Sequence, residues 1–409
     1  MKKETIIIRE KDIAVKVQNS KVNAIRTKDI SRKAVRVYDN NYLGVSGAVG
    51  ETSLNIIEQQ AIENLQTKIA YPYALTKNLK DHRNYIENYQ SEKDFVSTAE
   101  TIVETLRSNF DDFIFSETID LKEVEHQFKN SENLDLVYKD QIMNLGLLVK
   151  EKSSANLFDT VLMYSGRHFD INQFVAFNKK LLNACRHKVA LPKKEKLPVF
   201  MIQSHQVKGF LMRNLNGEVY ANGGSLFDKK VGETLFNKKI TLIQNYDSKI
   251  VQRSFFDNEG CVLENDQLPL IENGMLKRVF TDKKTAAKHN LEHTASASGN
   301  YDDIPKVTGT SVTFKTDSTE LKKVLGNQRA ILVILSAGGD FNADGKFASP
   351  VQSAYLFDGE EVLGKLPEFS IESNIYDMLG EDYIGTFAAP NLYFSDQTQI
   401  QGFYLTIKA

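Results

Sequence analysis

The chain has 409 residues, of which 41% are hydrophobic and 25% are charged, a balance typical of a folded globular protein and not of a disordered chain. Its 51 basic and 53 acidic residues leave a formal net charge of −2, which provides no overall field for binding nucleic acid or an anionic membrane. The two cysteines, Cys185 and Cys261, are too few for a disulfide framework and predict a reducing, cytoplasmic location.

The N-terminal residues do not have the pattern of a targeting segment. Three isoleucines at 6–8 follow a polar start, and this run is shorter than the roughly 7–15 apolar residues of a signal peptide. The longest apolar run, residues 330–335, is also much shorter than the roughly 20 residues of a membrane span. We therefore expect neither secretion nor membrane insertion.

The first half of the sequence predicts a mixture of helices and strands. Residues 34–49 predict a hairpin around an Asp-Asn-Asn turn, because two β-prone runs flank it. Alternating apolar residues over 135–164 predict further strands. Apolar residues at helical spacing predict three helices, over 52–69, 92–109 and 171–185.

A short charged run, Lys193 to Pro198, predicts a solvated linker, and we place the domain boundary there, giving domains 1–192 and 193–409. Beyond it, short β-prone runs alternate with Asn-Gly and Asp-Gly turns, and a helix is predicted over 282–293. The predicted fold class is α+β, with an N-terminal mixed α/β domain followed by a mostly antiparallel β C-terminal domain.

Several motifs occur in the order found in one protein family. They are FFDNEGCVLENDQLPLIENGMLKRVF at 255–280, Ser-Gly-Asn at 298–300, GGDFNADGKFASPVQSAYL at 338–356 and RKAVRVYDNNYLGVSGAVGETSLNIIEQQA at 32–61. In this order the chain resembles the TldD/PmbA family of metallopeptidase-related proteins. That family includes a peptidase subunit and a partner historically called a modulator of DNA gyrase.

The zinc motif of the family's peptidase subunit is missing. That subunit carries His-Glu-x-x-x-His on one helix, whereas residues 198–217 contain only His205, followed by Gln206. A glutamine cannot act as a general base, and one imidazole without other ligands cannot hold zinc. The chain therefore resembles the zinc-less PmbA branch, also called TldE, and the stretch 223–232 is similar to that branch as well.

The resemblance implies a non-catalytic subunit that pairs with a zinc-bearing TldD-like homologue and contributes to the cleavage of unfolded peptides. It implies no catalytic residue and no cofactor in this chain, zinc in the partner subunit, and a homodimer when the partner is absent. Exposed strand edges would hold an extended peptide. The polar residues of family-like motifs that would line such a chamber are Asp257, Glu259, Asn273, Asn300 and Asn342, although each is interpreted equally well as a turn or capping residue.

Two alternatives remain open. His289, Glu292 and His293 match the His-x-x-Glu-His order of inverted zinc peptidases, so the chain could be an independent zinc hydrolase, unless these are solvated helix-end histidines. A regulatory interaction protein without a peptidase role is the second alternative, and the balanced charge argues against direct DNA contact.

Two further patterns have simpler interpretations. Residues 340–345 mimic half of a calcium-binding loop, but Val351 occupies the position that needs a glutamate, so a β-turn is predicted. Cys261 is predicted to pack as a small apolar residue, because no histidine is near it in the sequence.

Overall fold

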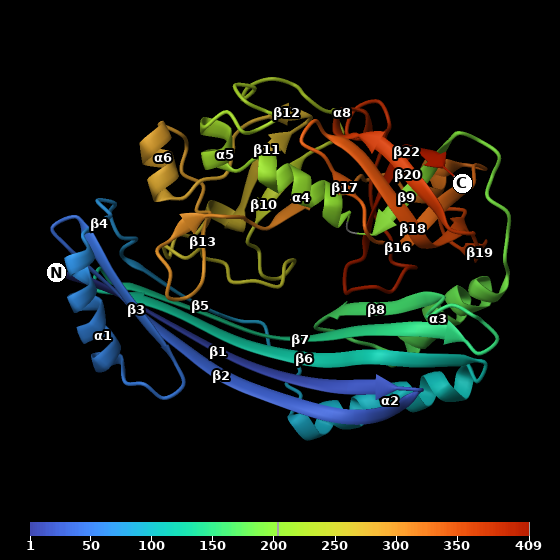
Figure 1. Cartoon of the computed structure of the whole chain (residues 1–409), viewed down its shortest axis with the longest axis horizontal. Helices are drawn as coiled ribbons and strands as arrows, with labels where there is room; N and C mark the ends of the chain where they lie inside the picture. Colours follow the sequence, from blue (N-terminus) through green and yellow to red (C-terminus); the bar gives the residue numbers. More distant parts are fainter. Residues whose placement is uncertain (203, 409) are drawn as a thin grey trace.

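The computed structural model describes residues 1–202 and 204–408, and it consists of two layers built mainly from β-sheet (Figure 1). A long curved sheet from the first half of the chain forms one layer. The second half forms the other, which lies across the concave face of that sheet. The predicted α+β class is confirmed, with strands dominating both halves.

The first sheet has the strand order β4-β3-β2-β1-β6-β7-β5, with β8 added beside β7. All neighbours are antiparallel except β5 and β7. The strands are β1 (Lys2–Gln18), β2 (Lys21–Asp39), β3 (Tyr42–Val49), β4 (Ile69–Ala70), β5 (Leu79–Asn84), β6 (Phe113–Asn130), β7 (Leu134–Glu151) and β8 (Thr160–Gly166).

Helices cover the two ends of this sheet. The predicted helix over 92–109 is α2 (Glu92–Asn109), which begins at Ser91, whose hydroxyl accepts a hydrogen bond from the Asp94 amide. Its apolar stripe is buried, and together with α3 (Ile171–Arg186) it contributes to the largest hydrophobic core. The helix predicted over 52–69 is shorter, because α1 (Leu54–Glu63) continues only as a 3-10 turn, η1 (Asn64–Thr67).

The second half contains a closed ring of strands. β9 (Lys196–Ile202), β22 (Gln399–Lys408), β20 (Phe369–Asn374), β18 (Lys346–Phe357) and β16 (Ala330–Ser336) pair in that order, and β16 also pairs with β9. Only the β16–β9 pair is parallel, so the prediction of mostly antiparallel strands is confirmed. Short strands flank the ring, namely β17 (Asp340–Phe341), β19 (Val362–Lys365) and β21 (Tyr383–Ala388).

A smaller four-stranded sheet has the order β12-β11-β10-β15. Its strands are β10 (Leu242–Asn245), β11 (Gln267–Glu272), β12 (Met275–Leu276) and β15 (Val312–Phe314). A separate pair joins β13 (Ala297–Ser298) and β14 (Lys306–Val307). The short helices of this half are α4 (His205–Asn214), α5 (Gly217–Ala221), η2 (Glu264–Asp266), α6 (Lys283–His289), α7 (Leu321–Leu325) and α8 (Ile375–Met378).

The boundary between the halves differs from the predicted solvated linker. Lys196, Leu197 and Pro198 already belong to β9, where they pair with β22, and Leu197 is buried. The two large sheets lie on either side of residue 192, but the largest core contains Phe115 and Leu147 of the first together with Phe200 and Tyr355 of the second. The halves therefore share the largest hydrophobic core, and the second half has a further large cluster of its own.

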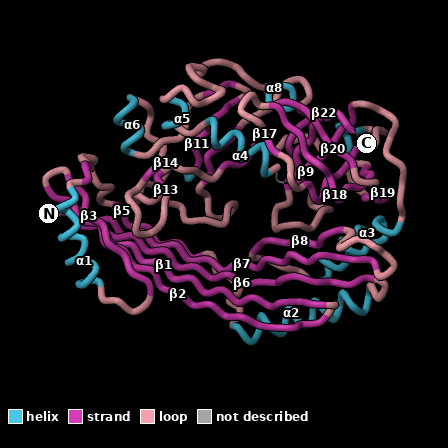
Figure 2. The backbone as a smooth tube through the Cα atoms, viewed as in Figure 1, coloured by secondary structure: helices cyan, strands magenta, loops and turns pink. Residues whose placement is uncertain are grey.

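The tube view shows how far the layers stay apart between their points of attachment (Figure 2). The α3 end of the first sheet packs against the strand ring through the shared core, and the β3 end approaches the loops near β13. Among the described residues, no helix combines the length and the apolar character needed to cross a membrane.

Candidate functional site

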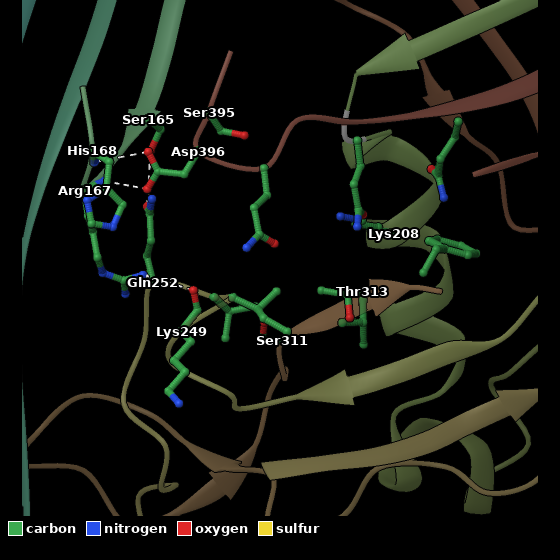
Figure 3. A pocket seen from close by; sticks show the side chains of 17 residues that line it. Ser165, Arg167, His168, Lys208, Lys249, Gln252, Ser311, Thr313, Ser395 and Asp396 are labelled. Atoms are coloured by element: carbon green, nitrogen blue, oxygen red, sulfur yellow. Dashed lines mark hydrogen bonds between the residues drawn. The ribbon is translucent and has the colours of Figure 1, made fainter. Parts of the chain in front are cut away.

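A polar cavity of about 370 Å³ lies between the two layers (Figure 3). It is bounded by the end of β8, the loop after β10, strand β15, helix α4 and the start of β22. Its lining residues are Ser165, Arg167, His168, Lys208, Lys249–Gln252, Ser311–Phe314, Ser395–Gln397, Gln399 and Gln401. We call it the central cavity.

Arg167 fixes one wall of the central cavity. Its Nε and Nη2 atoms donate to the two carboxylate oxygens of Asp140 at 2.7 and 2.6 Å, and Asp140 is fully buried in β7. Nη2 also donates to the carbonyl of Ser248 at 2.7 Å. Asp396 accepts the Arg167 amide at 2.7 Å. Because a bidentate pair sets both distance and orientation, this wall holds the loops of the second half against the first sheet.

The edge of β15 forms part of the opposite wall. One side of β15 pairs with β10, and within the part of the chain that is described no strand pairs with its other side. Four consecutive residues, 311–314, line the central cavity. Since successive side chains of a strand point to opposite faces, a lining by consecutive residues means that the strand edge faces the cavity.

Helix α4 borders the central cavity and two neighbouring ones, and it is the helix where the zinc motif would lie. His205 and Gln206 line cavities of about 680 and about 510 Å³ on either side of the helix start. The Gln206 amide donates to the Ser336 hydroxyl at 3.3 Å. Phe210, where the second histidine of the motif would stand, is buried beside Phe341 with 4.7 Å between ring centroids. One imidazole, one amide and one phenyl ring do not fit a zinc site.

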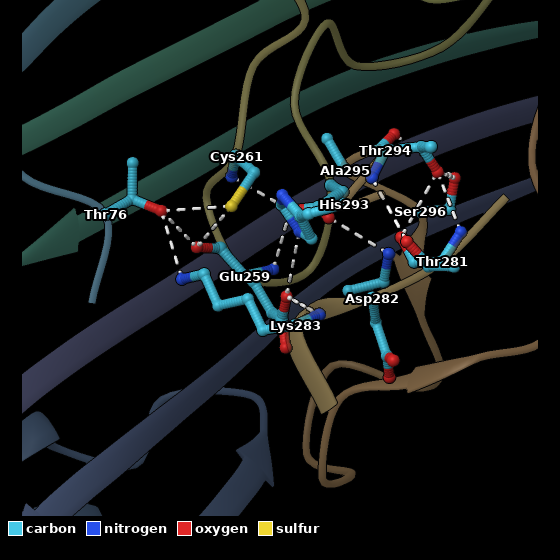
Figure 4. A network of polar contacts seen from close by, with 12 residues as sticks. Thr76, Glu259, Cys261, Thr281, Asp282, Lys283, His293, Thr294, Ala295 and Ser296 are labelled. Carbon is cyan, nitrogen blue, oxygen red and sulfur yellow. Dashed lines mark hydrogen bonds and ion pairs between the residues drawn. The ribbon is translucent and has the colours of Figure 1, made fainter. Parts of the chain in front are cut away.

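A second cluster of chemistry-bearing side chains lies near the β3 end of the first sheet (Figure 4). Asp257, Glu259, Cys261 and His293 bring ligand-type atoms within 4.8 Å of one another. The Asp257 carboxylate accepts the amides of Glu259, Cys261 and Ala297 at 2.8–2.9 Å. The hydrogen bonds of this carboxylate therefore stabilise the turn at 257–261 and its contact with Ala297.

The Glu259 carboxylate in this cluster is also fully engaged. It accepts a hydrogen bond from the Tyr71 hydroxyl and one from the Lys283 amide at 3.1 Å, and it lies 3.8 Å from His293 Nε2. The Lys283 ammonium donates to Thr76, whose hydroxyl lies 3.1 Å from Cys261 Sγ. Hydrogen bonds and a neighbouring ammonium already engage these carboxylates, and the cluster joins the two halves of the chain.

The pKa values follow from these contacts. Burial, reinforced by the neighbouring Glu259, raises the pKa of Asp257 to about 6. Burial alone would also raise the pKa of Glu259, but the nearby His293 and the charge of Lys283 hold that pKa below its usual value. The pKa values of the two carboxyls are therefore shifted in opposite directions, upward for Asp257 and downward for Glu259.

A buried arginine extends this joint into the first sheet. Arg36 of β2 is completely buried and donates to the carbonyls of Asn258 and Asp303 at 2.5 and 3.2 Å. Its guanidinium lies 3.6 Å from Glu4, which also accepts the Tyr38 hydroxyl at 2.7 Å. We call the cluster formed by Arg36, Glu4, Asp257 and Glu259 and their hydrogen-bond partners the buried joint.

None of the five residues predicted to line a peptide chamber lines the three cavities described above. Asp257 and Glu259 belong to the buried joint, and Asn273 occupies the β11–β12 turn with φ of 49°. Asn300 is exposed and donates to Asp303, while Asn342 accepts the amides of Asp344 and Lys346 in the β17–β18 turn. The three cavities described above have walls built from other residues, and the turn predicted for 340–345 is confirmed.

The three candidate ligands of the alternative zinc site have separate partners. Helix α6 ends at His289 because Asn290 adopts the left-handed conformation, with φ of 52°. His289 then pairs with Glu218 at 3.1 Å, Glu292 with Arg278 at 2.7 Å and His293 with Glu259 at 3.8 Å. The prediction of a helix over 282–293 was wrong in its last turn, and its three candidate ligands face three different partners.

Several residues of the central cavity were missed from the sequence. Gln397, Gln399 and Gln401 alternate along the chain, and such a period of two predicts a polar face on a strand. Lys208 interrupts an apolar stripe that contains Val207, Phe210 and Leu211. Both patterns can be recognised in the sequence, but neither predicts which distant segments of the chain pack beside these residues.

Comparisons with known proteins identify the family of the second half. Residues 201–388 match the PmbA/TldA metallopeptidase C-terminal domain. A zinc metalloprotease TldD homologue of Saccharolobus solfataricus is 24% identical over 272 residues, which cover 62% of this chain and 59% of that protein. The chain thus spans less than two thirds of that relative. A metalloprotease of Methanocaldococcus jannaschii is 23% identical and covers 89% of this chain and 85% of its own.

Solved structures extend the likeness in fold to the whole chain. TldE from Thermococcus kodakarensis superposes with a TM-score of 0.82 at 20% identity, covering 100% of this chain and 97% of its own. A candidate modulator of DNA gyrase from Thermotoga maritima gives a TM-score of 0.77 at 15% identity, covering 99% and 96%. The chain is therefore similar to the TldD/PmbA metallopeptidase-related proteins, since residues 201–388 match their C-terminal domain and the whole chain has a TldE-like fold.

Proposed function

We propose that this chain is the non-catalytic, peptide-binding subunit of a TldD/TldE-type zinc peptidase, in which a zinc-bearing homologue performs the cleavage of unfolded peptides. One observation carries the proposal. Helix α4 stands at a cavity between the layers and at a second one within the second half, where the family's motif would place a zinc, but it presents His205, Gln206 and the buried Phe210. Metal and general base must then come from a partner.

The central cavity supports the binding of an extended peptide. The free edge of β15 offers main-chain donors and acceptors to a strand lying in the cavity, which is the β-augmentation mode of peptide recognition. Main-chain pairing requires an unfolded segment and depends little on the side chains of that segment. This mode of binding would explain why the proposed substrates are unfolded peptides of varied sequence.

The test compares the chain alone with the chain co-expressed and co-purified with a zinc-bearing TldD homologue. Zinc is measured by elemental mass spectrometry, oligomeric state by light scattering, and cleavage on a permanently unfolded polypeptide. We expect the lone chain to be zinc-free, inert and homodimeric. The complex should hold zinc in the partner and should cleave.

Two variants separate this proposal from an independent zinc hydrolase. His289→Ala and His293→Ala should leave zinc content and cleavage by the complex unchanged, since neither side chain lies at a cavity described above. Stoichiometric zinc in the lone chain, lost in either variant, would overturn the proposal. So would cleavage by the lone chain that a chelator abolishes.

A further inference from the structure

Lys208 places an amine without a counterion at the central cavity. It lies on α4, is half-buried and lines the cavity. Burial lowers the pKa of this amine, and no neighbouring carboxylate offsets the effect among the described residues. A desolvated ammonium without a partner is costly, so the protein carries a cost here that a bound anion would remove.

Gln401 stands behind the same cavity wall. Its side chain is 2% exposed. The amide nitrogen donates to the Thr386 hydroxyl at 3.3 Å, whereas the amide oxygen has no hydrogen-bond partner in the described part of the chain. This oxygen has almost no accessible surface, so Lys208 is the group that a ligand in the cavity would meet.

The cations around the cavity outnumber the anions. Arg167, Lys208 and Lys249 line it, against one acidic side chain, Asp396. Figure 3 shows Arg167, His168 and Asp396 on one side and Lys208 with Thr313 on the other. Buried Asp140 already balances Arg167, and Lys249 is exposed to solvent, so Lys208 is the partly desolvated cation without a partner among the described residues, next to the edge of β15.

We propose that the central cavity binds a carboxylate of an extended peptide, with the peptide main chain along the edge of β15 and the carboxylate on the Lys208 ammonium. This inference rests on the proposed peptide-binding function and specifies the ligand group that the site selects. The carboxylate is either the peptide's C-terminus or an acidic side chain, and both present the same pair of oxygens to the amine.

The experiment measures binding of fluorescein-labelled peptides of equal length to the full chain by anisotropy, at fixed ionic strength. One peptide is uncharged with a free C-terminal carboxylate, the second is its C-terminal amide, and the third is that amide with one glutamate inside. Lys208→Met keeps most of the side-chain length and removes the charge, and Lys208→Arg keeps the charge. Lys238→Met, at an exposed lysine outside the cavity, is the matched control.

We expect Lys208→Met to weaken binding of at least one carboxylate-bearing peptide about tenfold or more, and Lys208→Arg to restore most of it. The fully amidated peptide should bind the wild type and Lys208→Met equally. Comparing the first and third peptides shows whether the terminal or the side-chain carboxylate is bound.

The failures are distinguishable. If all three peptides bind but Lys208→Met weakens none, or weakens all equally, the carboxylate site is refuted and peptide binding stands. If no peptide binds the wild-type chain or its complex with the zinc-bearing homologue, the proposed function fails as well. Misfolding does not obscure the result, because removing an unpaired half-buried charge should leave the thermal unfolding midpoint of Lys208→Met equal to or above that of the wild type.

Discussion

At the scale of single residues, the buried joint shows how charges are kept inside this protein. Arg36 has no exposed surface, yet it is held by Glu4 and by two carbonyl oxygens of the second half. Breaking a buried pair by removing one partner costs more than the pair itself contributes, since the remaining charge is left without compensation. Each hydrogen bond of the joint therefore has a measurable effect on stability.

Tyr71→Phe tests one of these bonds. The substitution removes the hydroxyl that donates to the buried Glu259 carboxylate and should lower the free energy of unfolding by about 1–3 kcal/mol. Tyr73→Phe is the matched control, because Tyr73 packs edge-on against Tyr71 but is only half-buried. Urea denaturation of the full chain measures both. Equal losses in the two variants would contradict the role of the Tyr71 hydroxyl.

Asp257→Asn tests the pH dependence of the joint. The pKa of Asp257 is raised from 3.8 to about 6, so the folded state binds its proton more tightly than the unfolded state does. The stability from this group is fully present below about pH 4 and is lost as pH rises through 6. The wild type should therefore exceed Asp257→Asn in stability by more at pH 4 than at pH 7, with a change of about 1–3 kcal/mol between them.

Glu259 opposes this trend, because its pKa is lowered and its contribution is lost as pH falls. The comparison between wild type and Asp257→Asn removes most of that background. Denaturant midpoints at several pH values provide the measurement, with Asp29→Asn at an exposed position of β2 as control. A stability difference that grows with pH would contradict the assignment.

At the scale of elements, the β2–β3 turn illustrates what could be read from the sequence. The turn was predicted between residues 34 and 49, and Asn40 and Asn41 occupy it with φ of 49° and 66°. Asparagine tolerates this left-handed conformation because its short side chain bonds locally. Helix α2 was predicted equally well, since Ser91 caps it and its apolar stripe is regular.

Asn41→Val should lower the free energy of unfolding by about 1–2 kcal/mol, because a β-branched residue is strained at positive φ. Asn41→Gly, which accepts that conformation freely, should be neutral or stabilising. Thermal unfolding of the two variants provides the test. A valine as stable as glycine at this position would show that the turn does not require positive φ.

The long strands could not be predicted in the same way. Residues 23–29 of β2 are exposed on both faces, so the sequence there has no alternation of apolar and polar side chains. Pairing with β1 along almost its whole length holds this part of β2 extended. The central cavity was unpredictable for a similar reason, since Arg167, Lys208, Thr313 and Gln401 come together only through the packing of distant segments. The absence of the zinc motif was readable, because that motif is local.

At the scale of the whole molecule, the shared core decides how independent the halves are. Phe200, Tyr355 and Phe357 of the second half pack in the same cluster as Phe115 and Leu147 of the first. The two large sheets separate at residue 192 in sequence but not in their hydrophobic interior. A domain with its own core could fold alone, and the second half has such a cluster, which includes Leu242 and Ile371, whereas the largest cluster of the first half is the shared one.

Separate production of residues 1–192 and 193–409 tests this. We expect fragment 1–192 to show no cooperative thermal transition and to bind a hydrophobic dye, because its face of the shared core would be exposed. Fragment 193–409 keeps a cluster of its own and should unfold cooperatively, at a lower temperature than the intact chain. Co-expression of the two fragments should restore a cooperative transition. Two independent transitions that reproduce those of the intact chain would show that the halves are autonomous.

The attachment of the first sheet at both of its ends has a mechanical consequence. Strand β1 has 17 residues, a length of roughly 56 Å at about 3.3 Å per residue. The sheet is held at one end by the shared core and at the other by the buried joint, and the central cavity lies between them, where Arg167 pairs with Asp140. The sheet is thus fixed at two points, and widening the space between the layers requires bending its strands. Under the proposed function, an extended chain would enter without bending the strands, whereas a folded domain would have to bend the whole sheet, so the stiffness of the sheet would set a size limit without a lid.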